Sequence, residues 1–213
     1  MIDYLIIFAT ASPRRVELAQ KIEFVNPSGH EISHACVVRI KPIFLPSNVT
    51  ETVIAGDDAA TRTARANAEL KARYAAERND CAVLAFDTVV GIGDTVLGKP
   101  INADDARRMF RLLCGNTHEV VTAVCLIANG KTIVESEKTL VTFGSYDGRV
   151  IDEYIDSGAP FDKAGGYNIA DEALKPIIKS FDGDYDNIVG MPVQLTEKLI
   201  EENILYGEVG NSD

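Results

Sequence analysis

The run CAVLAFDTVV, residues 81–90, decides how the rest of the chain is interpreted. Such a near-continuous apolar run is typical of a β-strand that is covered on both faces. Near its end the strand presents a carboxylate, Asp87, and a hydroxyl, Thr88. A buried carboxylate without a partner is costly, so Asp87 requires a cation, a hydrogen-bond network or a metal ion beside it. Lys99, in the Gly-Lys-Pro that follows, is a candidate cation, and capping of the next turn is the alternative role for Asp87.

Predicted strands and helices alternate on both sides of this run. The apolar spacing predicts helices at residues 16–22, 57–78, 102–114 and 148–157, and a last helix that begins at Pro192. It predicts further strands at residues 4–9, 120–128, 132–143, 177–181 and 185–189. Asn129-Gly130 is a strong signal for a hairpin between two of these strands, and the last two strands are predicted to form a second hairpin. This order predicts an α/β fold with a mixed, twisted β-sheet and flanking helices.

Composition and charge exclude several classes of protein. The formal charge of −11 over 213 residues argues against a broad surface for nucleic acid or anionic membranes, although a local basic cluster can still bind a small anion. No secretory signal is predicted, and no apolar stretch approaches the roughly 18 residues of a membrane span. The four cysteines have no C-x-x-C spacing. We therefore expect a reduced, cytoplasmic protein, with residues 207–213 frayed.

Basic side chains gather where the first predicted helix begins. Ser12 suits the N-cap position and Pro13 the first helical position. Arg14 and Arg15 then oppose the helix dipole unless an anion is bound there. The alternative is that both arginines pair with some of the 32 acidic residues. The doubled arginine favours an anion site.

Three other patterns fall short of known sites. The segment GDTVLGKP at residues 93–100 has proline where a phosphate-binding P-loop needs a hydroxyl, and it is predicted as strand, turn and strand. The haloacid-dehalogenase box needs a second aspartate two residues after Asp87, where this chain has valine. His30, His34 and Cys36 have no further metal ligand close by in the sequence, so we interpret them as surface residues.

Four segments, in this order and spacing, resemble the Maf family of nucleoside triphosphate pyrophosphatases, first known as septum-formation inhibitors: residues 11–15, 86–90 with 98–100, 157–167, and 187–192. The resemblance extends from Leu5 to Leu199. It implies a single Maf-like domain over residues 1–213. The implied fold has two lobes around a cleft, as in inosine triphosphate pyrophosphatases.

The family reaction splits the α–β phosphoanhydride of a nucleoside triphosphate and needs a divalent cation, Mg²⁺ or Mn²⁺. The resemblance implies that Asp87 is the catalytic carboxylate and a metal ligand, and that Glu51 is a second metal ligand. It implies that Ser12, Arg14, Arg15 and Lys99 bind the phosphates. It also implies that Lys163 either lies near the phosphates or orders its own loop. Such chemistry agrees with the residues themselves, since triphosphates need several donors and Mg²⁺ prefers hard oxygen ligands.

Base preference is the least determined property. Arg14 and Thr88 agree with the family branch that acts on dTTP and UTP. Ala170, however, stands where the family has a glutamine, so we expect CTP or modified pyrimidines as further substrates. Asn67 stands where the family has a lysine on the long helix, and Lys71, one turn later, can supply the charge instead.

A second class of function stays open at this stage. The chain could be a nucleotide-binding regulator of cell division that hydrolyses nothing important. Asp87 and Lys99 favour the enzyme, because a protein that only binds nucleotides needs no activated water. We expect a nucleoside triphosphate as substrate and neither nucleic acid nor membrane as partner, and a homodimer is left open.

Overall fold

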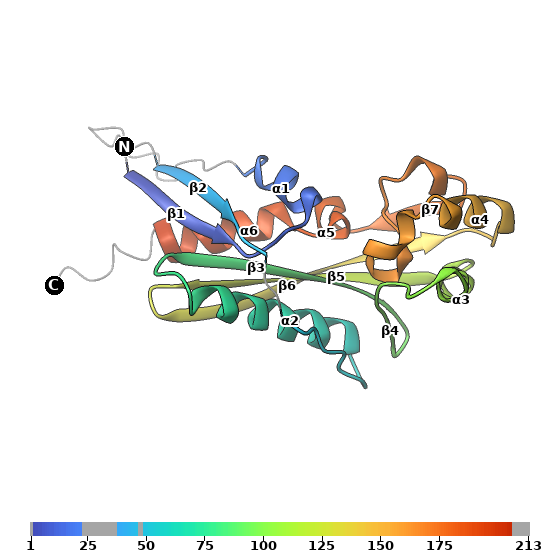
Figure 1. Ribbon diagram of the computed structural model, residues 1–213, viewed down its shortest axis with the longest axis horizontal. Coiled ribbons are helices and arrows are strands. Elements are labelled where there is room, and N and C mark those ends of the chain that lie inside the picture. The colour runs from blue at the N-terminus through green and yellow to red at the C-terminus, as the bar shows by residue number, and fades with distance from the viewer. Residues whose placement is uncertain (1, 23–37, 47–48, 206–213) are drawn as a thin grey trace.

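Three long strands run through almost the whole length of the molecule. The computed structural model describes residues 2–22, 38–46 and 49–205, and its longest strands are β3 (Ala82–Ile92), β5 (Thr117–Ala128) and β6 (Lys131–Phe143) (Figure 1). The run predicted to be a buried strand is therefore the central strand of the fold. The hairpin predicted at Asn129-Gly130 joins β5 to β6, and both turn residues have the positive φ that such a turn requires, 51° and 72°.

The sheet is mixed, as predicted. Its order is β2-β1-β3-β5-β6-β7, and β4 pairs with β3 outside this path. The strands β2, β1 and β3 are parallel, whereas β3, β5, β6 and β7 are antiparallel neighbours. The four shorter strands are β1 (Ile2–Phe8), β2 (Val38–Phe44), β4 (Thr95–Leu97) and β7 (Ile178–Asp182).

Helices cover the sheet as two lobes, one at each end of the long strands (Figure 1). The first lobe consists of β1 and β2 with α1 (Pro13–Ala19), α2 (Ala59–Ala76) and α6 (Val193–Ile200), and α2 covers the opposite sheet face from α1 and α6. The second lobe consists of β7, α3 (Ala103–Leu113), α4 (Gly148–Asp156) and the 3₁₀ turns η1 (Ala159–Asp162), η2 (Ala164–Gly166) and η3 (Glu172–Leu174). Helix α5 (Tyr185–Val189) lies between them, and a π-helical turn, η4 (Glu201–Leu205), follows α6.

Side chains of β3 alternate between the two faces of the sheet. Leu84 and Phe86 pack with β1, α1 and α6, whereas Val83 and Ala85 pack with the alanines of α2. Further along the strand, Val90 joins the core of the second lobe. Both faces of β3 are thus buried, which confirms the expectation drawn from its apolar run.

The second predicted hairpin is wrong in its second half. Residues 178–182 form the strand β7, but residues 185–189 form helix α5 instead of a return strand. Two local signals stabilise the helix: the Asp184 carboxylate accepts from the Asp186 N–H at 2.9 Å, and Gly190 ends the helix with a φ of 118°. A cap at each end outweighs the strand-like composition of this short segment.

Among the residues described, no helix is long and apolar enough to cross a membrane. His30, His34 and Cys36 lie outside the described residues.

One buried histidine makes the second lobe sensitive to pH. His118, on β5, is only 2% exposed, and its Nε2 lies 2.7 Å from the hydroxyl of Tyr167. Its Nδ1 has no hydrogen-bond partner among the described residues, and its ring packs edge-on against Phe143. Burial lowers the pKa of His118 from 6.5 to about 4. The folded state therefore binds a proton on this ring less readily than the unfolded chain does.

We predict that His118 makes the protein less stable as the pH falls from about 6.5 towards 4, because protonation favours the unfolded chain. The contribution is fully present above pH 6.5, and about 2 kcal/mol of it should be lost between pH 7 and pH 5. Urea unfolding at both pH values checks this. His118→Asn should be less stable than wild type at pH 7 but should lose less stability on acidification. An equal loss of unfolding free energy between pH 7 and pH 5 in wild type and His118→Asn would contradict the prediction.

Candidate active site

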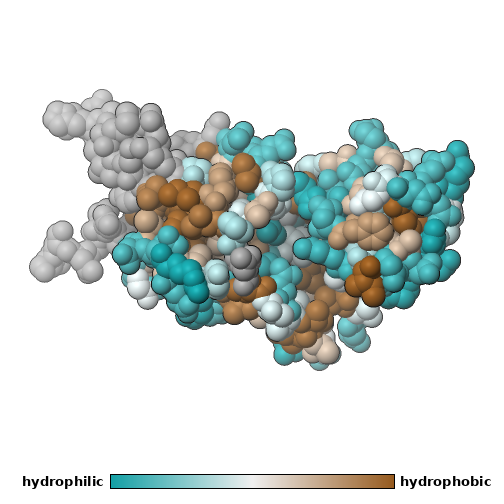
Figure 2. All heavy atoms as spheres, in the orientation of Figure 1, coloured by the Kyte–Doolittle hydropathy of each residue, from teal (hydrophilic) through white to brown (hydrophobic). Residues whose placement is uncertain are grey.

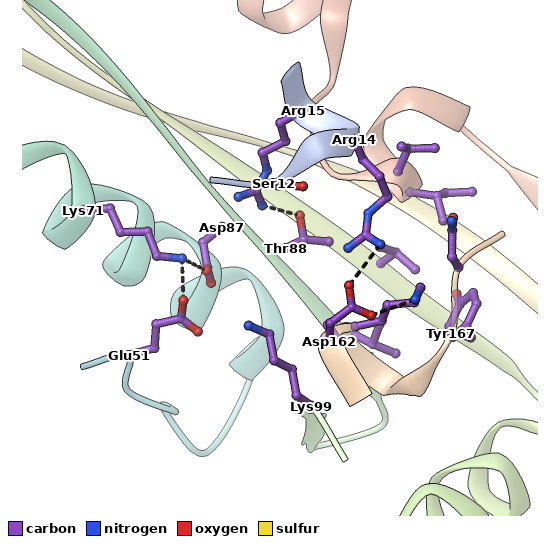
Figure 3. Close-up of a pocket in the computed structure, with 17 residues that line it drawn as sticks. Ser12, Arg14, Arg15, Glu51, Lys71, Asp87, Thr88, Lys99, Asp162 and Tyr167 are labelled. Atoms are coloured by element: carbon purple, nitrogen blue, oxygen red, sulfur yellow. Dashed lines mark hydrogen bonds and ion pairs between the residues drawn. The ribbon is translucent and has the colours of Figure 1, made fainter. Parts of the chain in front are cut away.

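A cavity of about 150 Å³ lies between the two lobes, beside the central strand β3 (Figure 3). Its walls come from both lobes, because α1, Lys71 of α2 and the η1–η2 segment all reach it. On the face seen in Figure 2, the end that carries α3 and α4 is mostly hydrophilic. All eight site residues predicted from the sequence line this cavity: Ser12, Arg14, Arg15, Glu51, Asp87, Thr88, Lys99 and Lys163.

The alternation of β3 sends its two polar side chains to different partners. Asp87 follows the face of Val83 and Ala85 and meets α2, where its Oδ1 lies 2.5 Å from the Nζ of Lys71. Thr88 follows the other face, where its hydroxyl accepts from Arg15 at 3.0 Å and lies 2.9 Å from the hydroxyl of Thr122 on β5. One strand thus presents a carboxylate and a hydroxyl to the same cavity from opposite faces.

The cation beside Asp87 is Lys71, and not Lys99, the candidate suggested by the sequence. Lys71 is one-tenth exposed and also lies 2.6 Å from Oε1 of Glu51, so one ammonium joins two carboxylates. Lys99 also lines the cavity but makes no ion pair with the part of the chain that the structure describes. Residues 67 and 71 are one turn apart on α2 and lie on the same face of the helix. The side chain at position 71 can therefore reach Asp87, as Asn67 also does.

Polar side chains on α2 hold the segment that carries Glu51. Thr63, Asn67 and Lys71 recur every fourth residue along the alanine-rich face of the helix. The Thr63 hydroxyl accepts from the backbone N–H of Ile54 at 2.9 Å. The Asn67 amide accepts from Thr52 N–H at 2.9 Å, donates to Thr52 O at 3.0 Å and reaches Asp87 Oδ2 at 3.3 Å. These bonds from α2 to the neighbouring segment were not predicted, although polar residues at every fourth position on a face of small residues could have indicated them.

The two carboxylates differ in how readily they ionise. Burial raises the pKa of Asp87, and the nearby charge and hydrogen bond of Lys71 offset this only in part. Burial also acts to raise the pKa of Glu51, but the hydrogen bond and charge of Lys71 outweigh it and hold that pKa below its usual value. Asp87 is therefore the better proton acceptor of the pair.

The two arginines have different surroundings. Arg15 donates from Nε to the Gly190 carbonyl at 2.7 Å and from Nη2 to Thr88, so two of its five donors are engaged by the protein. Among the residues that the structure describes, Arg14 makes a single long ion-pair contact, 3.6 Å from its Nη1 to Oδ2 of Asp162. Thr88, which the resemblance named with Arg14 as a selectivity position, contacts Arg15. Gly190 suits this position, because its φ of 118° is rarely adopted by other residues and a Cβ would lie 3.1 Å from the Thr88 hydroxyl.

The remaining predicted residues fall into two groups. Ser12 stands at the N-cap position of α1 without a capping bond from its side chain, and it lines the cavity. Lys163 donates to the Ala159 carbonyl at 2.5 Å and to Asp162 at 2.7 Å, so in this conformation it orders its own loop. The same loop is joined to the Gly-Lys-Pro segment by a 2.9 Å bond from Gly165 N to the residue 98 carbonyl.

The end of the cavity around Tyr167 is different in character. Tyr167 lies across the cavity from Lys71, Glu51 and Asp87 (Figure 3). Apolar side chains line the cavity as well: Val90, Val120, Ala164, Ile188 and Val189. Asn168 also lines it. Ala170, the position where a glutamine was expected to read the base, does not line it and faces a separate groove beside β7.

The residues present suit a divalent cation. One oxygen of Asp87 and one of Glu51 both contact the ammonium of Lys71. The two carboxylates are therefore close enough to share one positive charge. Mg²⁺ and Mn²⁺ sites commonly use one or two carboxylates and take the other ligands from water and phosphate. Within the described ranges no group of three or more His, Cys, Asp or Glu side chains could hold a metal, so a pair of carboxylates is what this site offers.

We predict that Lys71→Met lowers the free energy of unfolding by about 3 kcal/mol at pH 7, because it leaves the buried Asp87 without a counter-charge. In an Asp87→Asn background the same change should cost much less, since no charge is then stranded. Urea unfolding of the four proteins measures this coupling. Lys175→Met is the matched control: it breaks an exposed 2.6 Å pair with Glu172 and should be nearly neutral. Equal costs of Lys71→Met in both backgrounds would contradict the role of the pair.

Comparison with known proteins agrees with this geometry. A solved structure of a HAM1 protein from Coxiella burnetii superposes with a TM-score of 0.50 at 14% identity, covering 93% of this chain and 99% of that one, which supports the two-lobed α/β fold. Relatives named dTTP/UTP pyrophosphatase are 37% identical in Koribacter versatilis (92% of each chain) and 35% identical in Bdellovibrio bacteriovorus (92% of this chain, 97% of the relative). Another, from Thermococcus gammatolerans, is 37% identical over 92% of this chain and 96% of its own. Because the family model described as Maf-like protein also matches residues 5–203, the chain belongs to the family of Maf-like proteins.

Proposed function

We propose that this protein is a metal-dependent nucleoside triphosphate pyrophosphatase, a hydrolase that splits the α–β phosphoanhydride of pyrimidine nucleotides. Its substrates would be dTTP and UTP, and its products a nucleoside monophosphate and pyrophosphate. The observation that carries the proposal is the placement of Asp87, a buried carboxylate of raised pKa, in one cavity with Glu51, Arg14 and Lys99. The names of the relatives support the same activity.

Three side chains are available to hold the triphosphate. Ser12, Arg14 and Lys99 line the cavity, and their donors are not taken up by short bonds within the described chain. Charge-assisted hydrogen bonds to phosphate are among the strongest in proteins, so a few such donors can hold the chain of phosphates in one register. Arg15 and Lys163 would act mainly by fixing the walls, because each already donates two hydrogen bonds within the protein.

Asp87 and Glu51 would hold the divalent cation, Mg²⁺ or Mn²⁺. When bound there, it supplies charge neutralisation at the phosphates and lowers the pKa of water. The ammonium of Lys71 contacts both carboxylates, and it would have to release part of these contacts for Asp87 and Glu51 to hold the cation. Asp87 then serves as a metal ligand or takes the proton of the attacking water, and its raised pKa suits the second role.

A nucleotide-binding regulator of cell division is the alternative function. A protein that only binds nucleotides has no use for two carboxylates converging on a cation beside the phosphate donors, so the site favours the enzyme. The formal charge of −11 supports the further proposal that neither nucleic acid nor an anionic membrane surface is a partner.

Pyrophosphate release from a panel of triphosphates, with Mg²⁺ or Mn²⁺, tests the proposal. UTP and dTTP should be turned over, and Asp87→Asn should lower kcat by roughly 10²–10⁴-fold, because it removes the charge needed for proton transfer or cation binding. Nucleotide binding should survive, which calorimetry can check. Activity of Asp87→Asn within a few-fold of wild type would remove Asp87 from the chemistry. No turnover of any triphosphate by the wild type would favour the regulator.

Arg14→Ala should raise KM for UTP by about tenfold or more with a smaller effect on kcat, since it removes a charged donor to phosphate. The loss in kcat/KM should be smaller for UDP, which has fewer phosphate oxygens to bind. Arg15→Ala should behave differently and also lower the melting temperature, because Arg15 holds Gly190 and Thr88 in place. Equal losses with UTP and UDP would show that Arg14 is structural.

A further inference from the structure

The cavity holds one neutral amide at its Tyr167 end. Asn168 follows Tyr167 directly and lines the cavity, together with the apolar residues Val120 and Ile188. The other polar groups near this end are occupied. The Tyr167 hydroxyl lies 2.7 Å from His118, and the Thr88 hydroxyl lies between Arg15 and Thr122. A flat, mostly apolar group carrying a polar edge would therefore meet Asn168.

Neighbouring bonds fix which way the Asn168 amide points. Its Oδ1 accepts from the backbone N–H of Ala170 at 3.2 Å, and a backbone N–H can only donate. Its Nδ2 donates to Asp171 Oδ1 over a long 3.4 Å. The other Asp171 oxygen accepts from the Tyr154 hydroxyl at 2.5 Å, which holds that carboxylate in place. The amide oxygen is thus engaged, and the amide nitrogen retains an N–H for a ligand.

We propose that Asn168 is the residue that selects the base, by donating from Nδ2 to the carbonyl at position 4 of uracil or thymine. This rests on the proposed pyrophosphatase function, in which the triphosphate lies toward Asp87 and the base toward Tyr167. Cytosine carries an amino group at position 4, which would oppose a donor, so CTP is disfavoured. The expectation drawn from Ala170, that CTP is accepted loosely, is replaced: Asn168 supplies a polar contact from two residues earlier in the loop.

The test compares kcat/KM for UTP, dTTP and CTP in wild type, Asn168→Leu, Asn168→Asp and Ala170→Gln. Wild type should prefer UTP over CTP by about tenfold or more, the scale of one hydrogen bond gained and one donor clash avoided. Asn168→Leu should bring the ratio close to one, mainly by losing UTP. Asn168→Asp presents acceptors and should shift the preference towards CTP. Glu172→Gln, an exposed change in the same loop outside the cavity, is the control and should keep the wild-type ratio.

Two results would overturn the inference while leaving the enzyme in place. One is a UTP to CTP ratio that stays at the wild-type value in both Asn168 variants. The other is a ratio that changes only in Ala170→Gln, which would return base selection to position 170. If the wild type releases no pyrophosphate, the proposed function fails separately. Calorimetric binding of UTP and CTP then decides the inference, because the same change in ratio is expected for the dissociation constants, and equal binding of both nucleotides by wild type would overturn it.

Discussion

The ion pair between Lys71 and Asp87 is the interaction on which the rest of the site depends. A carboxylate on the central strand of a sheet covered on both faces is stable as an ion only with a cation in contact. Lys71 can supply that cation only if α2 presents this row of residues to the sheet. The same orientation brings Asn67 and Thr63 against the segment from Thr52 to Ile54 and carries Glu51 to the cavity. One electrostatic requirement thus sets the rotation of a helix and the position of a neighbouring loop.

Features determined by local sequence could be predicted well. The buried strand follows from its apolar run, and the β5–β6 hairpin follows from Asn129-Gly130, because two residues of positive φ fix the turn without help from the rest of the fold. Asp87 could be selected from the residues alone, since a carboxylate in such a strand needs an explanation. Thr88 was marked as the hydroxyl at the end of that strand, but its role came from the family resemblance. Glu51 and Lys163 were assigned only through the resemblance.

Features determined by packing could not be predicted. The choice of Lys71 over Lys99 depends on how α2 is rotated against the sheet, and an alanine-rich helix carries little amphipathic signal to specify this. Residues 185–189 have strand-like side chains, and only their caps reveal the helix. Asn168 and Ala170 are two residues apart, yet the turn between them sends one to the cavity and the other to a separate groove. Spacing in the sequence does not resolve that difference.

The continuity of the long strands limits how the two lobes can move. Strands β5 and β6 remain paired from Thr117 opposite Thr142 to Ala128 opposite Lys131, and they pass through both lobes. Hinged enzymes close by rotating a few loop residues that have no such pairing. Here any closure over a nucleotide must twist a hydrogen-bonded sheet, which resists large excursions. The paired sheet therefore fixes the width of the cleft. Any movement that admits substrate is confined to the short segments at the rim of the cleft.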